Sequence, residues 1–176
     1  MRAPILHTER LTLSPPAPAD LEDEAVMWAD PGVYAMIGGR AFSREEVWHR
    51  LLRYIGHWQV CGYGTWIVRE TDTGGFAGSV GLMDSRRATE PSYEGTPEAG
   101  WAFSPAVHGR GYAREAMAAL LGWGDRRFAR TVCIIDPANA PSIRLAEAIG
   151  YRPTTRATYR DTPTLLFERT TATRAM

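Results

Sequence analysis

The sequence predicts one α/β domain in which a mixed, mostly antiparallel sheet of about six to seven strands is flanked by about four helices. In some segments apolar and polar residues alternate, or apolar residues follow one another without a break, and turn sequences separate these segments; this is typical of strands. In other segments apolar residues recur every three to four positions, which is typical of helices. One strand also leads through a glycine turn into an amphipathic helix. With 176 residues the chain has the length of a single domain, which we place at 1–170 with a frayed tail over 171–176.

The first half of the chain predicts a strand, two helices and a hairpin. Period-two alternation stops at a proline pair, and the second helix begins with capping-box spacing at Ser43 and ends at glycines. Two runs rich in strand-forming residues then flank a turn sequence, which predicts an antiparallel pair. In chain order, these elements are a strand at 9–15, helices at 20–29 and 43–61, and hairpin strands at 65–70 and 76–84.

The second half predicts alternating strands and helices after a polar loop. This loop has glycine and proline without a clear period, so we expect a mobile surface segment that is a candidate cover for a binding site. A continuous apolar run indicates a strand covered on both faces, and the last two strands form a hairpin. The elements are the loop at 85–97, strands at 98–103 and 131–136, helices at 112–128 and 139–150, and the final strands at 154–161 and 164–170.

Composition excludes several classes of function. The 20 acidic and 20 basic residues balance, so there is no basic surface for nucleic acid, whose binding depends on phosphate neutralisation. Cys61 and Cys133 form no paired spacing, which favours a reducing compartment, and the four histidines lie too far apart for a zinc site. Without a signal peptide or a run of roughly 20 apolar residues, we expect a cytoplasmic protein with no membrane segment and no metal.

The turn HGRGYA at 108–113 is the most informative motif. Gly109 and Gly111 stand where a strand gives way to a helix, and a helix start with unpaired N–H groups attracts phosphate. A dinucleotide-binding turn would require a third glycine where the chain has Arg114, and a nucleotide P-loop would require a lysine, which the chain lacks. The alternative that remains is a tight structural connection without a ligand.

Three segments resemble the GCN5-related N-acetyltransferase (GNAT) family over nearly the whole chain. HGRGYA is similar to the family's Q/R-x-x-G-x-G/A pyrophosphate motif, with a departure at His108. DPANAPSIRLAEAIGYR at 136–152 is similar to its second CoA-contacting segment, and TERLTLSPPAPADLE at 8–22 resembles the branch that acetylates ribosomal-protein N-termini, on alanine or serine. The resemblance implies acetyl-CoA as the acetyl donor.

The resemblance also implies a sheet that splays at the strand ending near Phe103, with pantetheine lying in the gap as an extra strand. Arg110 and Arg114 would lie beside the pyrophosphate, although Arg114 is equally well read as a solvated surface arginine. Asn139 would bind CoA or cap its helix. The residues expected to bind the donor are Trp101, Ala102, Phe103, His108, Gly109, Arg110, Gly111, Tyr112, Ala113, Arg114, Asn139 and Ser142.

Acetyl transfer requires a neutral amine, so a carboxylate in the cleft can serve as the base, directly or through water. Glu98 is the candidate, because it heads the strand that carries the acetyl group in the family; an exposed strand-end carboxylate is the alternative. The acid that protonates the departing thiolate is Ser142 or Tyr151 by resemblance. Ser142 can equally support a helix cap, and Tyr151 is at a position more often found in a core.

The function implied is direct acetyl transfer to a primary amine, with a protein or peptide N-terminus as the leading acceptor and a small-molecule amine as the alternative. A CoA-binding module without catalysis and a dinucleotide-binding protein are the competing hypotheses. We expect the two N-terminal helices, the loop 85–97 and the final hairpin to determine which acceptor binds.

Trp28, Trp48 and Trp58 are predicted to be mostly core residues, with one or two of them lining an acceptor pocket. The oligomeric state stays open, with a homodimer as a candidate.

Overall fold

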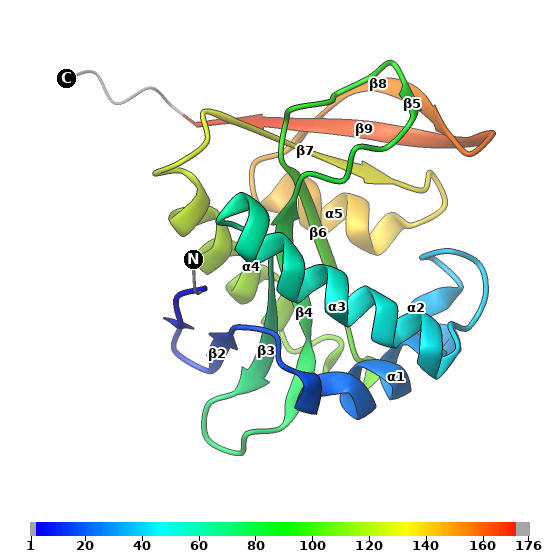
Figure 1. Ribbon diagram of the computed structural model, residues 1–176. Helices are drawn as coiled ribbons and strands as arrows, with labels where there is room; N and C mark the ends of the chain where they lie inside the picture. Colours follow the sequence, from blue (N-terminus) through cyan, green and yellow to red (C-terminus); the bar gives the residue numbers. More distant parts are fainter. Residues whose placement is uncertain (1–2, 172–176) are drawn as a thin grey trace.

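In the computed structural model, which describes residues 3–171, a nine-stranded sheet has five α-helices on its two faces (Figure 1). The sheet order is β1-β2-β3-β4-β6-β7-β9-β8-β5. The strands are β1 (Leu6–His7), β2 (Leu11–Ser14), β3 (Thr65–Glu70), β4 (Phe76–Met83), β5 (Thr89–Glu90), β6 (Glu98–Phe103), β7 (Arg130–Ile135), β8 (Arg152–Tyr159) and β9 (Thr162–Thr170). The helices are α1 (Leu21–Ala29), α2 (Pro31–Tyr34), α3 (Arg44–Cys61), α4 (Tyr112–Gly124) and α5 (Ala140–Ala148).

The two faces of the sheet are covered by different helices, because side chains alternate along a strand. On β6, Ala102 packs with the apolar side chains of α1 and α3, whereas Ala99 and Phe103 pack with α4. Figure 1 shows α3 and α1 across the near face and α5 behind the sheet. Residues of β6 with even numbers therefore belong to the α1–α3 face, and those with odd numbers belong to the α4–α5 face.

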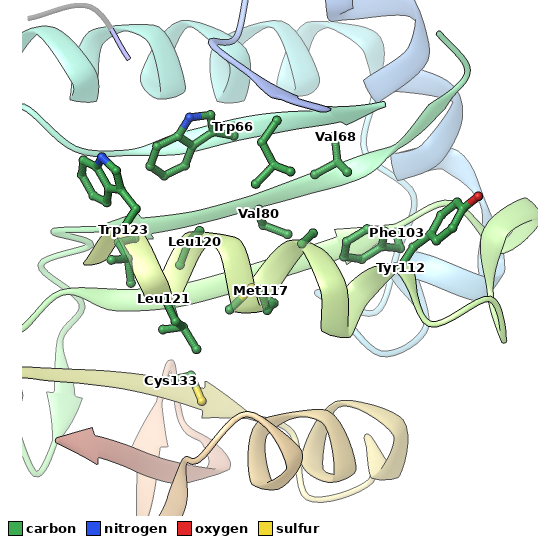
Figure 2. Packing of buried hydrophobic residues seen from close by; sticks show 14 of the residues in the cluster. Trp66, Val68, Val80, Phe103, Tyr112, Met117, Leu120, Leu121, Trp123 and Cys133 are labelled. Atoms are coloured by element: carbon green, nitrogen blue, oxygen red, sulfur yellow. The ribbon is translucent and has the colours of Figure 1, made fainter. Parts of the chain in front are cut away.

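The larger core cluster lies between the sheet and α4. Met117 and Leu120 are fully buried against the strands, and Leu121 approaches Cys133 of β7 (Figure 2). The spacing of these α4 side chains at three and four residues is what the sequence predicts for an amphipathic helix. Burial of these apolar side chains fixes α4, and with it the glycine turn that precedes the helix.

β6 and β7 are the one parallel pair among the strands of residues 3–171, and they separate almost at once. Their paired residues are Glu98 and Val132, at the start of β6. On its other side, β6 pairs with β4 along its whole length. The predicted splay at this strand is therefore confirmed, and it opens from the beginning of β6 toward Phe103.

The predicted mixed α/β class is confirmed, but the sheet has nine strands where the sequence predicts six or seven. The two additional strands, β1 and β5, contain two residues each, which is too short for alternation to be visible. A fifth helix, α2, follows α1 directly, where the sequence predicts no helix or strand. Asp30 accepts a hydrogen bond from the N–H of Gly32 (2.7 Å) and Pro31 occupies the first turn, so the same residues that end α1 begin α2.

The loop at 85–97 is attached to the domain more firmly than its polar sequence suggests. β5 pairs with β8, and the side chains of Thr89 and Tyr93 are buried. Tyr93 packs with Val132 of β7 on the α1–α3 face, so the loop covers the end of the gap where β6 and β7 pair. Of the predicted tail, Thr171 hydrogen-bonds to the carbonyls of Phe128 and Ala129, and 172–176 lie outside the described residues.

A carboxyl group is fully buried between α1 and the sheet. Glu24 accepts a hydrogen bond from the indole N–H of Trp28 (2.7 Å) through one oxygen, and the other oxygen has no partner within residues 3–171. Burial raises the pKa of Glu24 from 4.5 to about 7, against the hydrogen bond from Trp28 and the charge of Arg50. Glu24 therefore favours the folded state when protonated and opposes it when ionised.

We predict that Glu24→Gln changes the pH dependence of stability. Because the folded pKa exceeds the unfolded one, the contribution of Glu24 is fully present below pH 4.5 and is lost as pH rises through about 7. The Tm of Glu24→Gln minus the Tm of the native chain should therefore increase by about 4–8 °C between pH 5 and pH 8. This corresponds to a change of about 2 kcal/mol in the free energy of unfolding.

Glu22→Gln on the same helix is the matched control. The hydrogen bond from Arg44 lowers the pKa of Glu22, so this carboxyl is ionised in both states above pH 5 and its Tm difference should be constant over that range. Thermal unfolding by circular dichroism at four pH values provides the measurement. A Glu24→Gln difference that is also constant would show that the buried carboxyl does not carry this pKa.

Candidate active site

The gap between β6 and β7 is bordered by backbone groups of β6. The N–H of Val132 donates to the carbonyl of Pro97 (3.0 Å), so odd-numbered residues direct their backbone groups toward β7. Ala102, with an even number, pairs with β4 instead. The N–H and C=O of Trp101 therefore face an open strand position, which an extended ligand can occupy by backbone pairing.

The glycine turn presents a group of free N–H donors next to this gap. Gly109 (φ +76°) and Gly111 (φ +79°) adopt the left-handed conformation that side chains disfavour, and Gly111 immediately precedes α4. Within residues 3–171, no acceptor is found for the N–H groups of Gly109, Gly111, Tyr112, Ala113 and Arg114. Such a cluster at a helix N-terminus, where the helix dipole is positive, binds phosphate oxygens.

His108, the departure from the family motif, joins the turn to the end of β6. Its Nε2 hydrogen-bonds to the carbonyl oxygen of Phe103 (3.0 Å), which acts as the acceptor. Because the Phe103 carbonyl already accepts this hydrogen bond, it is not available to a ligand in the gap. Among residues 101–103, Trp101 is therefore the one whose N–H and C=O can both pair with a ligand. His108 thus has a structural role that positions the turn.

The two arginines of the turn differ in their contacts. Arg110 forms an ion pair with Glu70 (2.6 Å) and donates to the hydroxyl of Tyr112 (2.6 Å), so its guanidinium is engaged at the end of β3. The ring of Tyr112 is buried, which leaves only its backbone N–H for a ligand. Arg114 is exposed in the first turn of α4 and pairs with no residue of the described part of the chain, so it is the arginine available to a phosphate.

The start of α5 approaches the gap from the opposite side. Asn139 is buried and caps the helix, with its side-chain oxygen accepting from the N–H of Ser142 (3.1 Å). The hydroxyl oxygen of Ser142 accepts from the indole N–H of Trp101 (3.2 Å), which bridges β6 and α5. Ser142 therefore supports the helix start and also keeps its own hydroxyl proton free for another acceptor.

Glu98 lies at the closed end of the gap and is buried, in contrast to the exposed strand-end carboxylate that was the alternative. One of its oxygens, Oε2, accepts from Arg87 Nε (2.7 Å) and from the hydroxyl of Tyr93 (2.7 Å). Burial and the Glu98 charge raise the pKa of Tyr93, which keeps this hydroxyl a donor. The second oxygen of Glu98 forms no hydrogen bond within residues 3–171 and can accept a proton.

Sequence reasoning did not identify Arg87 and Tyr93, because both lie in the segment read as a polar loop. Burial acts to lower the pKa of Arg87, but the hydrogen bond and the charge of Glu98 outweigh it and raise that pKa. The pair is consequently a fixed ion pair at the base of the gap. A lone aromatic residue among polar ones, Tyr93, is the one sequence signal that this loop contacts the core.

Tyr151, the second candidate acid, belongs to the hydrophobic core. It is fully buried, its hydroxyl hydrogen-bonds to Thr131 (2.7 Å) at the start of β7, and burial raises its pKa. Cys133 is also buried and burial raises the pKa of its thiol. The structure therefore brings together Trp101 and Ser142 across the gap but places Tyr151 in the core.

The α1–α3 face above the gap is open at Gly100. This glycine is exposed in the middle of β6, and a methyl group added there would meet no atom within 4 Å. It lies on the same face as Glu98, two residues along the strand.

A recess of about 310 Å³ is lined on this side of the molecule by Phe42, Glu46, His49, Arg50 and Arg53. Trp48 lines a second recess, whereas Trp28 and Trp58 belong to the core.

Comparison with known proteins identifies the family. The model of the acetyltransferase (GNAT) domain matches residues 10–152. The chain belongs to the GNAT acetyltransferase family. Solved structures similar to it include a protein assigned to this family from Bordetella pertussis (33% identity, 95% of this chain and 99% of that chain, TM-score 0.84) and an acetyltransferase from Agrobacterium tumefaciens (29%, 96% and 95%, TM-score 0.82).

The relatives leave the acceptor open. The protein YkkB of Bacillus subtilis is 38% identical over 51% of this chain, a match that spans 52% of YkkB. Two solved structures in complex with coenzyme A share the fold: RimL, a ribosomal alpha-N-protein acetyltransferase (14% identity, 95% of this chain and 98% of that chain, TM-score 0.76), and an aminoglycoside acetyltransferase (16%, 91% and 94%, TM-score 0.73). These identities are low enough that the likeness concerns the fold alone.

Two further properties concern the described residues only. Residues 3–171 contain no cluster of three or more histidine, cysteine, aspartate or glutamate side chains arranged to hold a metal ion. None of their helices combines the length and the apolar character needed to cross a bilayer.

We predict that Gly111→Ala weakens the binding of coenzyme A about tenfold. A residue with a side chain is destabilised by about 1–2 kcal/mol at the φ of +79° that Gly111 adopts. The backbone of the variant relieves this strain by rotating, and the N–H groups that follow then no longer point at one ligand. Calorimetry with coenzyme A measures the effect. Gly122→Ala is the control, since Gly122 is an exposed residue of the same helix with free space around it. Equal Kd values for both variants would exclude the turn as the phosphate site.

Proposed function

We propose that the protein transfers an acetyl group from acetyl-CoA directly to a primary amine in a ternary complex. The single observation that carries this proposal is the parallel strand pair that separates after Glu98 and Val132 beside a turn with five unpartnered N–H groups. An open strand position suits the amides of pantetheine, and the N–H cluster suits a pyrophosphate. Membership of the GNAT family supports the same donor.

In this proposal the donor contacts three elements, which are the glycine turn, the first turn of α4 and β6. The N–H groups of the turn at 109–114 would hold the pyrophosphate, with Arg114 as an additional charged donor. The backbone of Trp101 would pair with pantetheine and align the thioester along β6. This arrangement directs the acetyl group toward Glu98 and Gly100, where the α1–α3 face is open to an acceptor.

In the proposed chemistry, the amine nitrogen attacks the thioester carbonyl carbon, the new C–N bond forms, and the C–S bond breaks. Glu98 takes the proton released by the amine, directly or through a water molecule, at the oxygen that its partners Arg87 and Tyr93 leave free. These two partners hold the carboxylate in place, which keeps the proton acceptor oriented.

Ser142 is the proposed proton donor to the departing thiolate, and it regains its proton from the solvent, to which Glu98 releases the proton of the amine. Its oxygen accepts from the indole N–H of Trp101, and a hydroxyl that accepts a hydrogen bond becomes a better donor through its own proton. Tyr151 is not used in this proposal, because its hydroxyl lies in the core against Thr131. The leading acceptor is a protein or peptide N-terminus, with a small-molecule amine as the alternative.

The proposal is tested by the release of free CoA thiol with a panel of amines that includes N-terminal peptides, polyamines, aminoglycosides and amino acids. With a productive amine, Glu98→Gln should lower kcat about 100-fold or more, and Ser142→Ala about 10–100-fold, because each removes a proton-transfer group. Both variants should bind coenzyme A in calorimetry. Glu90→Gln, an exposed carboxyl of β5, is the matched control and should keep native turnover.

Two results would contradict the proposal. Thiol release at the level of hydrolysis with every amine, together with tight coenzyme A binding, would indicate a binding module without catalysis. Native turnover in both Glu98→Gln and Ser142→Ala would remove these residues from the reaction.

A further inference from the structure

Two arginines on one face of α3 border the recess next to the open sheet surface. Arg50 and Arg53 are three residues apart, so their side chains emerge on the same side of the helix. The guanidinium of Arg50 lies over two neighbouring aromatic rings, 4.2 Å from the ring centroid of Trp28 and 4.8 Å from that of Phe42. This stacking fixes the position of the Arg50 charge without neutralising it.

Neither arginine has an acidic partner in the described part of the chain, although the recess contains a carboxylate. Glu46 is engaged elsewhere, because it pairs with Arg40 and accepts from the N–H of Ser43 (2.8 Å). Glu24 feels the charge of Arg50 but bonds to Trp28 instead. The recess therefore carries an excess of positive charge.

The charge excess lies on the same face of the sheet as the proposed proton acceptor. Trp28 and Phe42, which Arg50 contacts, belong to the apolar cluster that contains Ala102 of β6, and Ala102 shares its face of the strand with Gly100 and Glu98. Burial lowers the pKa of Arg53, and the charges of Arg50 and Arg87 both act in the same direction. Arg87 itself contacts Glu98 at 2.7 Å. Since the Glu98 carboxylate neutralises Arg87, Arg50 and Arg53 are the charges left for a ligand that enters over Gly100.

We propose that this recess binds a carboxylate of the acceptor, so that the substrate is an amine that carries an acidic group a few bonds from the reacting nitrogen. The inference rests on the proposed function and names its substrate class. A volume of about 310 Å³ accommodates an acidic side chain or a small amino acid, and Phe42 provides an apolar wall for its methylene groups. An acidic peptide N-terminus and a free acidic amino acid share this chemistry.

The test compares three peptide amides that begin with the same residue: Ala-Glu-Glu-Ala, Ala-Gln-Gln-Ala and Ala-Arg-Arg-Ala, with free L-glutamate as a fourth ligand. Calorimetry gives Kd without requiring turnover, and CoA release gives KM. Charge-assisted hydrogen bonds predict that the acidic peptide binds about tenfold or more tightly than the neutral one, and the basic peptide most weakly. Strong binding of glutamate alone would assign a small-molecule acceptor within the same class.

Substitutions at Arg53 separate a charge effect from a structural one. Arg53→Gln should reduce the preference for the acidic peptide, Arg53→Lys should keep most of it, and Arg53→Glu should reverse it in favour of the basic peptide. A purely structural role would weaken all peptides together. Arg126→Gln, an exposed arginine just beyond α4, is the matched control and should keep the native preference.

The outcomes distinguish the two proposals. Equal affinities for the three peptides, or a preference unchanged in Arg53→Glu, would overturn the carboxylate site even if amines support CoA release. An Arg53-dependent preference in calorimetry, combined with no CoA release from any amine, would support the carboxylate site and contradict the proposed catalysis.

Discussion

The pairing of β6 with β7 is the constraint on which the rest of the site depends. The two strands are parallel, and they pair only where Val132 meets the start of β6. β4 holds β6 along its other edge, and β9 holds β7 along its other edge, so neither strand can close the gap without leaving its own partner. Backbone groups that cannot pair within the chain are costly unless water or a ligand satisfies them, and this arrangement reserves them for a ligand.

The charged groups beside the gap have distinct tasks because their partners differ. Arg87 and Tyr93 both donate hydrogen bonds to one oxygen of Glu98, and this fixes the buried carboxylate in position. Neither donor is then available to a ligand. Arg110 is similarly committed to Glu70. Arg114 on α4 and Arg50 and Arg53 on α3 have no acidic partners among residues 3–171. Donor and acceptor can thus both be guided by charge although the chain as a whole is neutral.

The extent to which the sequence predicts this structure depends on the range of each interaction. Helix boundaries at Ser43 and Gly62 and the turn at Gly111 are local effects of capping and of left-handed backbone, and these predictions are confirmed. The strands β1 and β5 are too short to show periodicity. Arg87 acquires its role only through a contact with Glu98 eleven positions along the chain, and no local pattern signals it. Family resemblance indicates the place of the donor, whereas its residue roles stay proposals.

Amide hydrogen exchange with and without acetyl-CoA tests whether the backbone N–H groups of the β6–β7 gap and of the glycine turn bind the donor. We predict that saturating acetyl-CoA slows exchange at Trp101, Gly109 and 111–114, while the amides of β4, already paired with β6, change little. Unchanged exchange at these positions, with acetyl-CoA bound and protection located elsewhere, would contradict the assignment of the β6–β7 gap as the donor site.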